Sequence, residues 1–248
     1  MIVYAVINQK GGVGKSTTAA ALWAGLSSRG YKTLAIELDS QGNLSYTAGA
    51  SSEGKTALSL LTGEAKAEET IQHTRNGDII AASKALVGAD AFITDTGKEY
   101  RIKEALEPIS GLYDYVVIDT PPALGILTVN ALTACDKVII PAQADIYSLQ
   151  GIEQLIETIK PVKKYCNPNL KIEGILLTRH NSRLVLTKDI TSYVQQLASR
   201  LETKVFAAPI RECVAVKEAQ LNRKSVFEYA PKENAALDYA ALIDELLA

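Results

Sequence analysis

The sequence has little of what marks secreted, disulfide-linked or membrane-spanning proteins. Only three cysteines, Cys135, Cys166 and Cys213, occur among 248 residues. Their odd number and wide spacing exclude a disulfide framework and a cysteine zinc site, so we expect reduced thiols. No run of about 18 apolar residues occurs, and we expect no membrane span and no secretion signal. These absences favour a cytoplasmic protein.

The charges nearly balance, with 26 Lys and Arg against 28 Asp and Glu, but their placement is uneven. Residues 160–232 carry 14 basic and 6 acidic side chains, whereas the rest of the chain carries 12 and 22. Such a basic segment is either an ordinary solvated surface or a site for a polyanion such as DNA. Charge alone leaves both interpretations open.

Short apolar runs alternate with helix-length amphipathic stretches. This order is typical of an α/β fold with a doubly wound, mainly parallel sheet flanked by helices. Without a visible linker or repeat, the simplest organisation is a single domain over residues 1–248. We expect an irregular, mobile surface segment at residues 42–77, where periodicity is weak. The expected strands are Ile2–Ile7, Thr33–Leu38, Asp78–Ala82, Tyr115–Ile118, Lys137–Ile140, Lys171–Leu177 and Val205–Phe206.

In open parallel sheets, ligands bind beyond the carboxyl ends of the strands. Residues that follow Ile7, Leu38, Ile118 and Leu177 are therefore expected to line one crevice.

Residues 8–17, NQKGGVGKST, follow the first expected strand and precede an alanine-rich helix. This is the context of a phosphate-binding loop. Its glycines allow the backbone N–H groups to turn inward at a helix N-terminus, where an anion is favoured. The loop residues are Gly11, Gly12, Val13 and Gly14.

The residues on either side of these glycines carry the charged and hydroxyl groups. Lys15 adds a positive charge at the β- and γ-phosphates, Ser16 offers its hydroxyl to Mg²⁺, and Thr17 is placed to donate to the α-phosphate. At the start of the loop, Gln9 stands where the ordinary pattern has glycine, and a second lysine, Lys10, follows. Because Lys10 would crowd the glycine turn if it curled back, we expect it to project outward, toward a nucleotide held by a neighbouring subunit.

Two aspartates follow expected strands. Asp39 stands where a carboxylate can orient water beside a γ-phosphate; a turn cap is the alternative. Asp119 ends the apolar run Val116–Ile118, as in a Walker B motif, whose carboxylate holds Mg²⁺ or one of its waters. Burying that charge without a cation would be costly, which supports a metal-binding role. Glu37 is expected to be structural.

Three segments carry a family resemblance. Residues 10–16, KGGVGKS, resemble the deviant Walker A motif of the ParA/MinD class of P-loop ATPases. Residues 39–43 are similar to that family's Asp-Pro-Gln-Gly-Asn segment, with Ser40 in place of proline, and residues 119–122 match its Asp-Thr-Pro-Pro motif. The resemblance spans nearly the whole chain. It implies ATP and Mg²⁺ as cofactors, a nucleotide-sandwich homodimer, and catalytic roles for Lys10, Lys15 and Asp39.

The resemblance also implies roles in the basic segment. In relatives the loop after the last strand packs on the adenine, which would place Pro209, Ile210 and Arg211 beside the base, although the common Pro-Arg-Asn version is absent. No base-reading motif and no helix-turn-helix before Met1 are visible, so DNA contacts are expected to be nonspecific and salt-sensitive. The candidates for these contacts are Arg179, Arg183, Lys188, Arg211, Lys217, Arg223 and Lys224.

The leading hypothesis is a small ParA-type partition ATPase. It would dimerise on ATP, bind nonspecific DNA of the nucleoid, and be released when a centromere-binding ParB-type adaptor stimulates hydrolysis. A MinD-like membrane-positioning ATPase is one alternative, but it needs a basic amphipathic C-terminal helix, and residues 233–248 hold four acidic and no basic residues. The other is an ATP-dependent metabolic ligase on the same fold, which needs a further polar cluster that is not visible.

Overall fold

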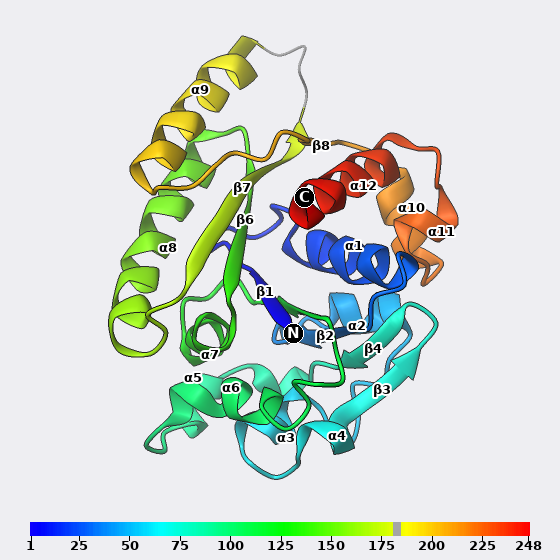
Figure 1. Cartoon of the computed structure of the whole chain (residues 1–248), viewed down its shortest axis with the longest axis vertical. Coiled ribbons are helices and arrows are strands. Elements are labelled where there is room, and N and C mark those ends of the chain that lie inside the picture. The colour runs from blue at the N-terminus through cyan, green and yellow to red at the C-terminus, as the bar shows by residue number, and fades with distance from the viewer. Residues whose placement is uncertain (181–184) are drawn as a thin grey trace.

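The computed structural model describes residues 1–180 and 185–248, with the backbone alone for residues 146 and 185–189. An eight-stranded sheet in the order β3-β4-β2-β5-β1-β6-β7-β8 forms its middle layer (Figure 1). Neighbouring strands are parallel except for the hairpin of β3 and β4. The strands are β1 (Ile2–Val6), β2 (Thr33–Glu37), β3 (Ile71–Thr74), β4 (Gly77–Ile80), β5 (Tyr115–Asp119), β6 (Lys137–Gln143), β7 (Lys171–His180) and β8 (Ile210–Arg211).

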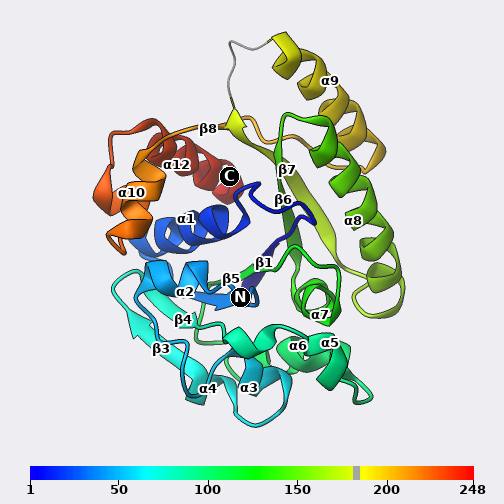
Figure 2. The same cartoon turned by 180° about the vertical axis from the view of Figure 1, so that it is seen from behind.

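Helices cover both faces of the sheet (Figure 1 and Figure 2). One core contains residues of α1 (Lys15–Ser28), α2 (Asn43–Ala48), α11 (Val226–Tyr229) and α12 (Asn234–Leu247), and α10 (Ala215–Leu221) lies beside it. The other contains residues of α3 (Ala57–Leu61), α4 (Ala67–Thr70), α5 (Ala89–Phe92), α6 (Arg101–Leu106), α7 (Ile126–Ala134), α8 (Ile146–Tyr165) and α9 (Val185–Arg200), and two 3₁₀ turns span Lys84–Leu86 and Lys98–Tyr100.

The central strands are apolar on both faces because each face packs against helices. In β1, Tyr4 and Val6 belong to the core with α1 and α12, whereas Val3 and Ala5 belong to the core with α7 and α8. This alternation follows from the two-residue period of a strand. β5 pairs with β1 and β2 so that Asp119 lies level with Val6 and Glu37, which aligns the ends of the three strands.

The doubly wound, mainly parallel fold is confirmed, but two local expectations are wrong. Residues 42–77 are not irregular: they form α2, α3, α4 and β3, and their apolar side chains, such as Leu44 and Leu61, are buried. These helices are too short to show a helical period in the sequence. The last strand is Ile210–Arg211, because Val205 makes only an isolated bridge to Ile175.

No helix in the described ranges combines the length and the apolar character needed to cross a bilayer.

Candidate nucleotide-binding site

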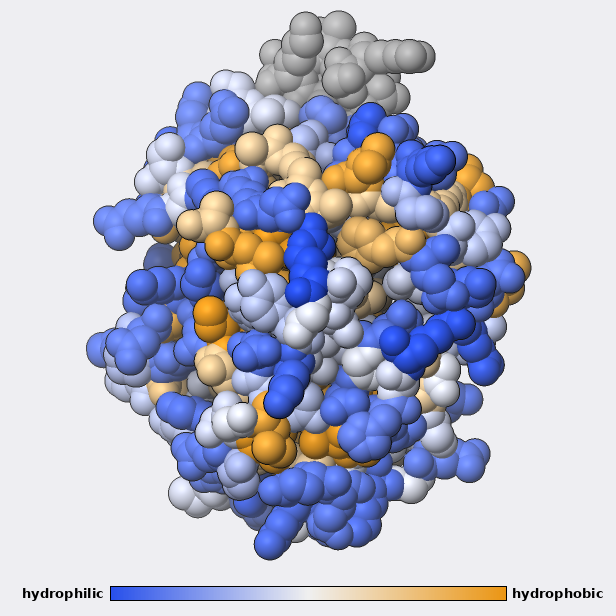
Figure 3. All heavy atoms as spheres, turned by 45° about the vertical axis from the view of Figure 1, so that its right-hand side comes forward, coloured by the Kyte–Doolittle hydropathy of each residue, from blue (hydrophilic) through white to orange (hydrophobic). Residues whose placement is uncertain are grey.

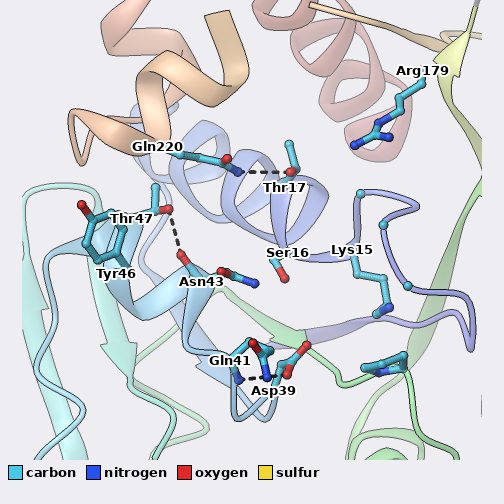
Figure 4. A pocket seen from close by; sticks show the side chains of 14 residues that line it. Lys15, Ser16, Thr17, Asp39, Gln41, Asn43, Tyr46, Thr47, Arg179 and Gln220 are labelled. Carbon is cyan, nitrogen blue, oxygen red and sulfur yellow. Dashed lines mark hydrogen bonds between the residues drawn. The ribbon is translucent and has the colours of Figure 1, made fainter. Parts of the chain in front are cut away.

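A cavity of about 540 Å³ opens beyond the carboxyl ends of the central strands (Figure 4). Its walls include the loop after β1, Asp39 after β2, Pro122 after β5 and Arg179 near the end of β7. These are the segments expected to line one crevice, and that expectation is confirmed. Gln220 of α10 closes a further side and donates to the Thr17 hydroxyl at 3.2 Å.

The loop that enters α1 has the backbone of a phosphate-binding turn. Gly12 and Gly14 have φ angles of 77° and 93°, in the left-handed region that favours glycine. Side chains from neighbouring strands fix its carbonyls: Thr178 donates to the oxygen of Val13 at 2.8 Å, and Gln143 donates to that of Gly12 at 3.0 Å. Since the first N–H groups of a helix have no partner within it, the entry of α1 offers donors to an anion.

Lys15 supplies a cation at this entry. Its side chain is buried, and its ammonium donates to the carbonyl oxygen of Lys10 at 3.1 Å. Burial lowers the pKa of Lys15, and the charges of Asp119 and Asp39 oppose this change. A buried positive charge at the positive end of a helix is energetically unfavourable without a counter-charge. The Lys15 ammonium and the N-terminus of α1 are therefore suited to binding an anionic ligand together.

Asp119 is a second buried charge, behind the cavity wall and next to the lining residues Lys15 and Ser16. Its side chain is fully buried, yet neither carboxylate oxygen has a hydrogen-bond partner within the described part of the chain. Burial, and then the charge of Glu37, raise its pKa well above the usual range. Ser16 lies near enough to oppose this rise, although not in hydrogen-bonding geometry. An unsatisfied carboxylate beside a serine hydroxyl fits a divalent cation with oxygen ligands.

Glu37 and Asp39 have different tasks. Glu37 is fully buried and accepts hydrogen bonds from the Leu44 and Ser45 amides, at 2.8 and 2.7 Å, and from the Ser45 hydroxyl. It therefore anchors the start of α2, as expected of a structural carboxylate. Asp39 lines the cavity, and its Oδ1 also accepts from the Gln41 amide at 3.0 Å. The turn cap is thus present at one oxygen, and the water-orienting role stays a prediction.

Lys10 does not project into solvent in the single chain. Its ammonium contacts both carboxylate oxygens of Asp145, at 2.8 and 2.6 Å, and lies 5.9 Å from the centre of the Tyr147 ring. Asp145 also caps α8 by accepting from the Ser148 amide at 2.9 Å. Burial would raise the pKa of Asp145, but the hydrogen bonds from Lys10 and Ser148 outweigh it and lower the pKa. The role of Lys10 toward a second chain stays a prediction.

A smaller pocket of about 160 Å³ adjoins the first cavity and shares Gly14, Thr17, Arg179 and Gln220 with it. Further lining residues include Ile210, Val216 and Tyr239, which give this pocket an apolar side. Of the three residues expected beside the base, Ile210 and Arg211 line the pocket, whereas Pro209 is not among its lining residues.

The described candidates for DNA contact do not share one environment. Arg179 lines the cavity, and Arg211 donates to Asp238 of α12 at 2.6–3.2 Å, so its charge is neutralised within the chain. Arg223 lies over the ring of Tyr46, whereas Lys224 pairs with Glu228. Lys217 is exposed at the rim of the smaller pocket, Arg183 lies outside the described residues, and so does the side chain of Lys188.

Figure 3 shows the side of the molecule on which α10 and α11 lie. Hydrophilic side chains dominate this face, broken by small apolar patches.

Sequence reasoning missed several residues of this site. Gln220, Tyr46 and Thr47 line the cavity from segments without a recognised motif. Asp145, the partner of Lys10, had a detectable signal, because aspartate before a helix that follows an expected strand is a common N-cap.

Comparisons with known proteins show relatives that match over nearly the full length of the chain. A family model described as an AAA domain matches residues 1–172. The sporulation initiation inhibitor protein Soj of Bacillus subtilis is 37% identical over 251 residues, covering 99% of this chain and 98% of that protein. The chromosome partitioning protein ParA of Myxococcus xanthus is 36% identical over 250 residues, covering 99% of this chain and 87% of that protein.

A solved structure with bound nucleotide has the same fold. The crystal structure of cobyrinic acid a,c-diamide synthase from Mycobacterium smegmatis, with a bound ATP analog and magnesium, has a TM-score of 0.85 and 34% identity. The similarity covers all of this chain and 94% of that one. With its loop after β1, Asp39 after β2 and Asp119 at the end of β5, the chain belongs to the AAA-domain family, together with relatives such as Soj and the chromosome partitioning protein ParA.

Proposed function

We propose that this protein is a Mg²⁺-dependent partition ATPase that pairs on ATP and then binds DNA without sequence preference. A centromere-binding ParB-type adaptor would stimulate hydrolysis and release it from the nucleoid. One observation supports the nucleotide site above all: Lys15 lines the cavity at a helix N-terminus, and the buried carboxylate of Asp119, which has no hydrogen-bond partner in the described chain, lies next to Lys15 and Ser16 of the cavity wall. Within the described chain Lys15 forms no ion pair and Asp119 accepts no hydrogen bond, so a phosphate and Mg²⁺ would supply the direct partners that these two groups lack.

The residues of the cavity divide the proposed work. The amides after Gly12 and the ammonium of Lys15 would bind the phosphates, and Thr17 would donate to the α-phosphate. Ser16 and Asp119 would hold Mg²⁺, which when bound neutralises charge on the phosphates. Asp39 would orient the attacking water. Hydrolysis then depends on positioning and charge neutralisation more than on covalent chemistry, so it is slow until every group is in place.

Lys10 is the group that would couple hydrolysis to pairing. In the single chain the Lys10 ammonium is bound by Asp145. The Lys15 ammonium of the same chain donates instead to the backbone carbonyl of Lys10. On pairing, Lys10 would leave Asp145 and contact the nucleotide of the second chain. The neighbour's phosphate would replace the carboxylate as the partner of its charge.

The DNA-binding part of the proposal is supported by the basic segment around α10. Lys217, Arg223 and Lys224 are all on α10 or just after it, beside the nucleotide cavity. A dimer would present these three basic residues twice, and the free energies of their contacts with DNA phosphates would add. Because the dimer would form only with ATP, the affinity for DNA would depend on ATP. The membrane alternative is disfavoured, because the apolar face of α12, with Tyr239 and Leu242, is buried against the rest of the chain.

A metabolic ligase is the second candidate, because the Mycobacterium smegmatis protein with 34% identity is named a synthase. A ligase must hold an acceptor beside the γ-phosphate, and it has no reason to bind DNA when ATP is present. DNA binding therefore separates the two functions.

The test is DNA binding measured by fluorescence anisotropy on a random-sequence duplex, with ATP, with ADP and without nucleotide. We expect tight binding with ATP alone, a steep loss with added salt, and no binding to anionic liposomes in a parallel sedimentation assay. Lys15→Ala is the matched control, which we expect to remove the effect of ATP. Equal DNA affinity in all three nucleotide states would contradict the proposal.

A further inference from the structure

Arg179 has a strained backbone at the mouth of the nucleotide cavity. It is the next-to-last residue of β7 and has a φ angle of 48°. Only two other non-glycine residues of the described chain, Glu202 and Arg223, have a positive φ. A residue other than glycine adopts this conformation at an energetic cost, and such residues occur preferentially at functional sites.

The guanidinium of Arg179 is directed into the cavity and is unpaired. Figure 4 shows the side chain extending from β7 toward the loop and the N-terminal end of α1. Among the described residues it has no hydrogen-bond or ion-pair partner, whereas the guanidinium groups of Arg101 and Arg211 each contact an aspartate. Arg179 is exposed, so its free guanidinium is solvated at the mouth of the cavity and adds positive charge near Lys15 that attracts an anionic ligand.

The position of Arg179 identifies which part of the ligand it faces. One cavity contains Lys15 and Ser16 and would hold the terminal phosphates, and the adjoining pocket contains Ile210 and Val216 and would hold the base. Arg179 belongs to both, together with Gly14, Thr17 and Gln220. In a nucleotide, the part between the terminal phosphates and the base is the α-phosphate with the ribose.

We propose that Arg179 binds the α-phosphate of the nucleotide held by its own chain, and is not a DNA contact. This rests on the proposed function, since it requires a nucleoside triphosphate in the cavity. A guanidinium matches phosphate oxygens in a planar, bidentate way that lysine does not reproduce. Because ATP and ADP share the α-phosphate, Arg179 strengthens the binding of both and does not distinguish them.

Arg179→Asn tests the proposal without adding backbone strain, because asparagine tolerates a positive φ. Binding of fluorescent ADP and ATP with Mg²⁺ is measured by titration, at protein concentrations too low for pairing. We expect both dissociation constants to rise about tenfold, as for a lost charge-assisted hydrogen bond. The melting temperature without nucleotide should not fall. Arg179→Lys keeps the charge and should lose less affinity.

Glu202→Asn is the matched control, since Glu202 has a φ of 52° and lines neither part of the cavity. It should leave both dissociation constants unchanged. The proposal is overturned if Arg179→Asn binds ADP and ATP like the wild type, or if it loses only DNA affinity. If the wild type binds neither nucleotide, the proposed function fails; if the wild type binds and Arg179→Asn binds equally well, only the role of Arg179 fails.

Discussion

Replacing Asp145 by asparagine releases Lys10 while preserving the helix that Asp145 caps. Asparagine is as good an N-cap as aspartate, so its side-chain oxygen can still accept from the Ser148 amide. What disappears is the negative charge that faces the Lys10 ammonium across 2.6 Å. If Lys10 must leave Asp145 before it reaches a second chain, the substitution favours pairing on ATP.

The size of this effect follows from the exposure of the ion pair. The side chains of Lys10 and Asp145 are 28% and 31% exposed, so the pair is stronger than a fully exposed one and far from a buried one. We assign the ion pair a stabilisation of about 1 kcal/mol, which is at the upper end of the values for exposed ion pairs. A dimer breaks two such pairs, which gives about 2 kcal/mol, or about a 30-fold tighter ATP-dependent dimer. The single chain should lose about 1 kcal/mol of stability, which lowers its melting temperature by about 2–4 °C.

The assay is sedimentation velocity over a concentration series with a slowly hydrolysed ATP analogue. Glu157→Gln is the control on the same helix. The ion pair between Glu157 and Lys160 is highly exposed, and both of its residues belong to α8. In a Lys10→Ala background, Asp145→Asn should have no effect on pairing. If Asp145→Asn lowers the melting temperature but dimerises no better than the wild type, then Lys10 does not need to leave Asp145, and the reasoning is refuted.

Three further substitutions probe the cavity. Lys15→Ala should abolish measurable binding of Mg²⁺–ATP in calorimetry, because the buried cation is lost; binding at the wild-type affinity would contradict its role. Asp39→Ala should bind ATP normally but hydrolyse it about a hundredfold more slowly or worse, and should stay on DNA in a release assay; hydrolysis at the wild-type rate would exclude a water-orienting role. Because burial raises the folded-state pKa of Asp119 above its unfolded value, stability without Mg²⁺ should fall as pH rises from about 4 through the folded pKa. Asp119→Asn should flatten this fall and increase stability at pH 8 in urea unfolding, while losing stabilisation by Mg²⁺; a variant less stable than the wild type at pH 8 without Mg²⁺ would contradict the buried-charge account.

The sequence was sufficient for the elements that are buried on both sides. β1, β2 and β5 could be predicted because a strand covered by helices on both faces must be an apolar run. The phosphate loop could be predicted because its conformation requires glycine at Gly12 and Gly14, and such a requirement is visible in sequence. The segment 42–77 could not, because its short helices are stabilised by capping groups such as Thr56 and by contacts with distant parts of the chain.

The charged residues were harder to assign than the fold. Counting charge in residues 160–232 placed Arg179 and Arg211 with the DNA contacts, whereas the structure pairs Arg211 with Asp238 and turns Arg179 into the cavity. The rule that residues after strands line the crevice already pointed to Arg179, since it follows Leu177. Asp145 could be predicted as an N-cap but not as the partner of Lys10, because it is distant in sequence and comes close to Lys10 only through the pairing of β6 with β1.

The central claim is that filling the cavity with ATP and pairing through Lys10 are one event. Sedimentation velocity of the wild type and of Lys10→Ala, each with saturating ATP analogue or with ADP, tests it most directly. We predict dimers for the wild type with the ATP analogue and single chains in the other three samples. Single wild-type chains at saturating ATP analogue, or dimers of Lys10→Ala as stable as those of the wild type, would contradict the claim.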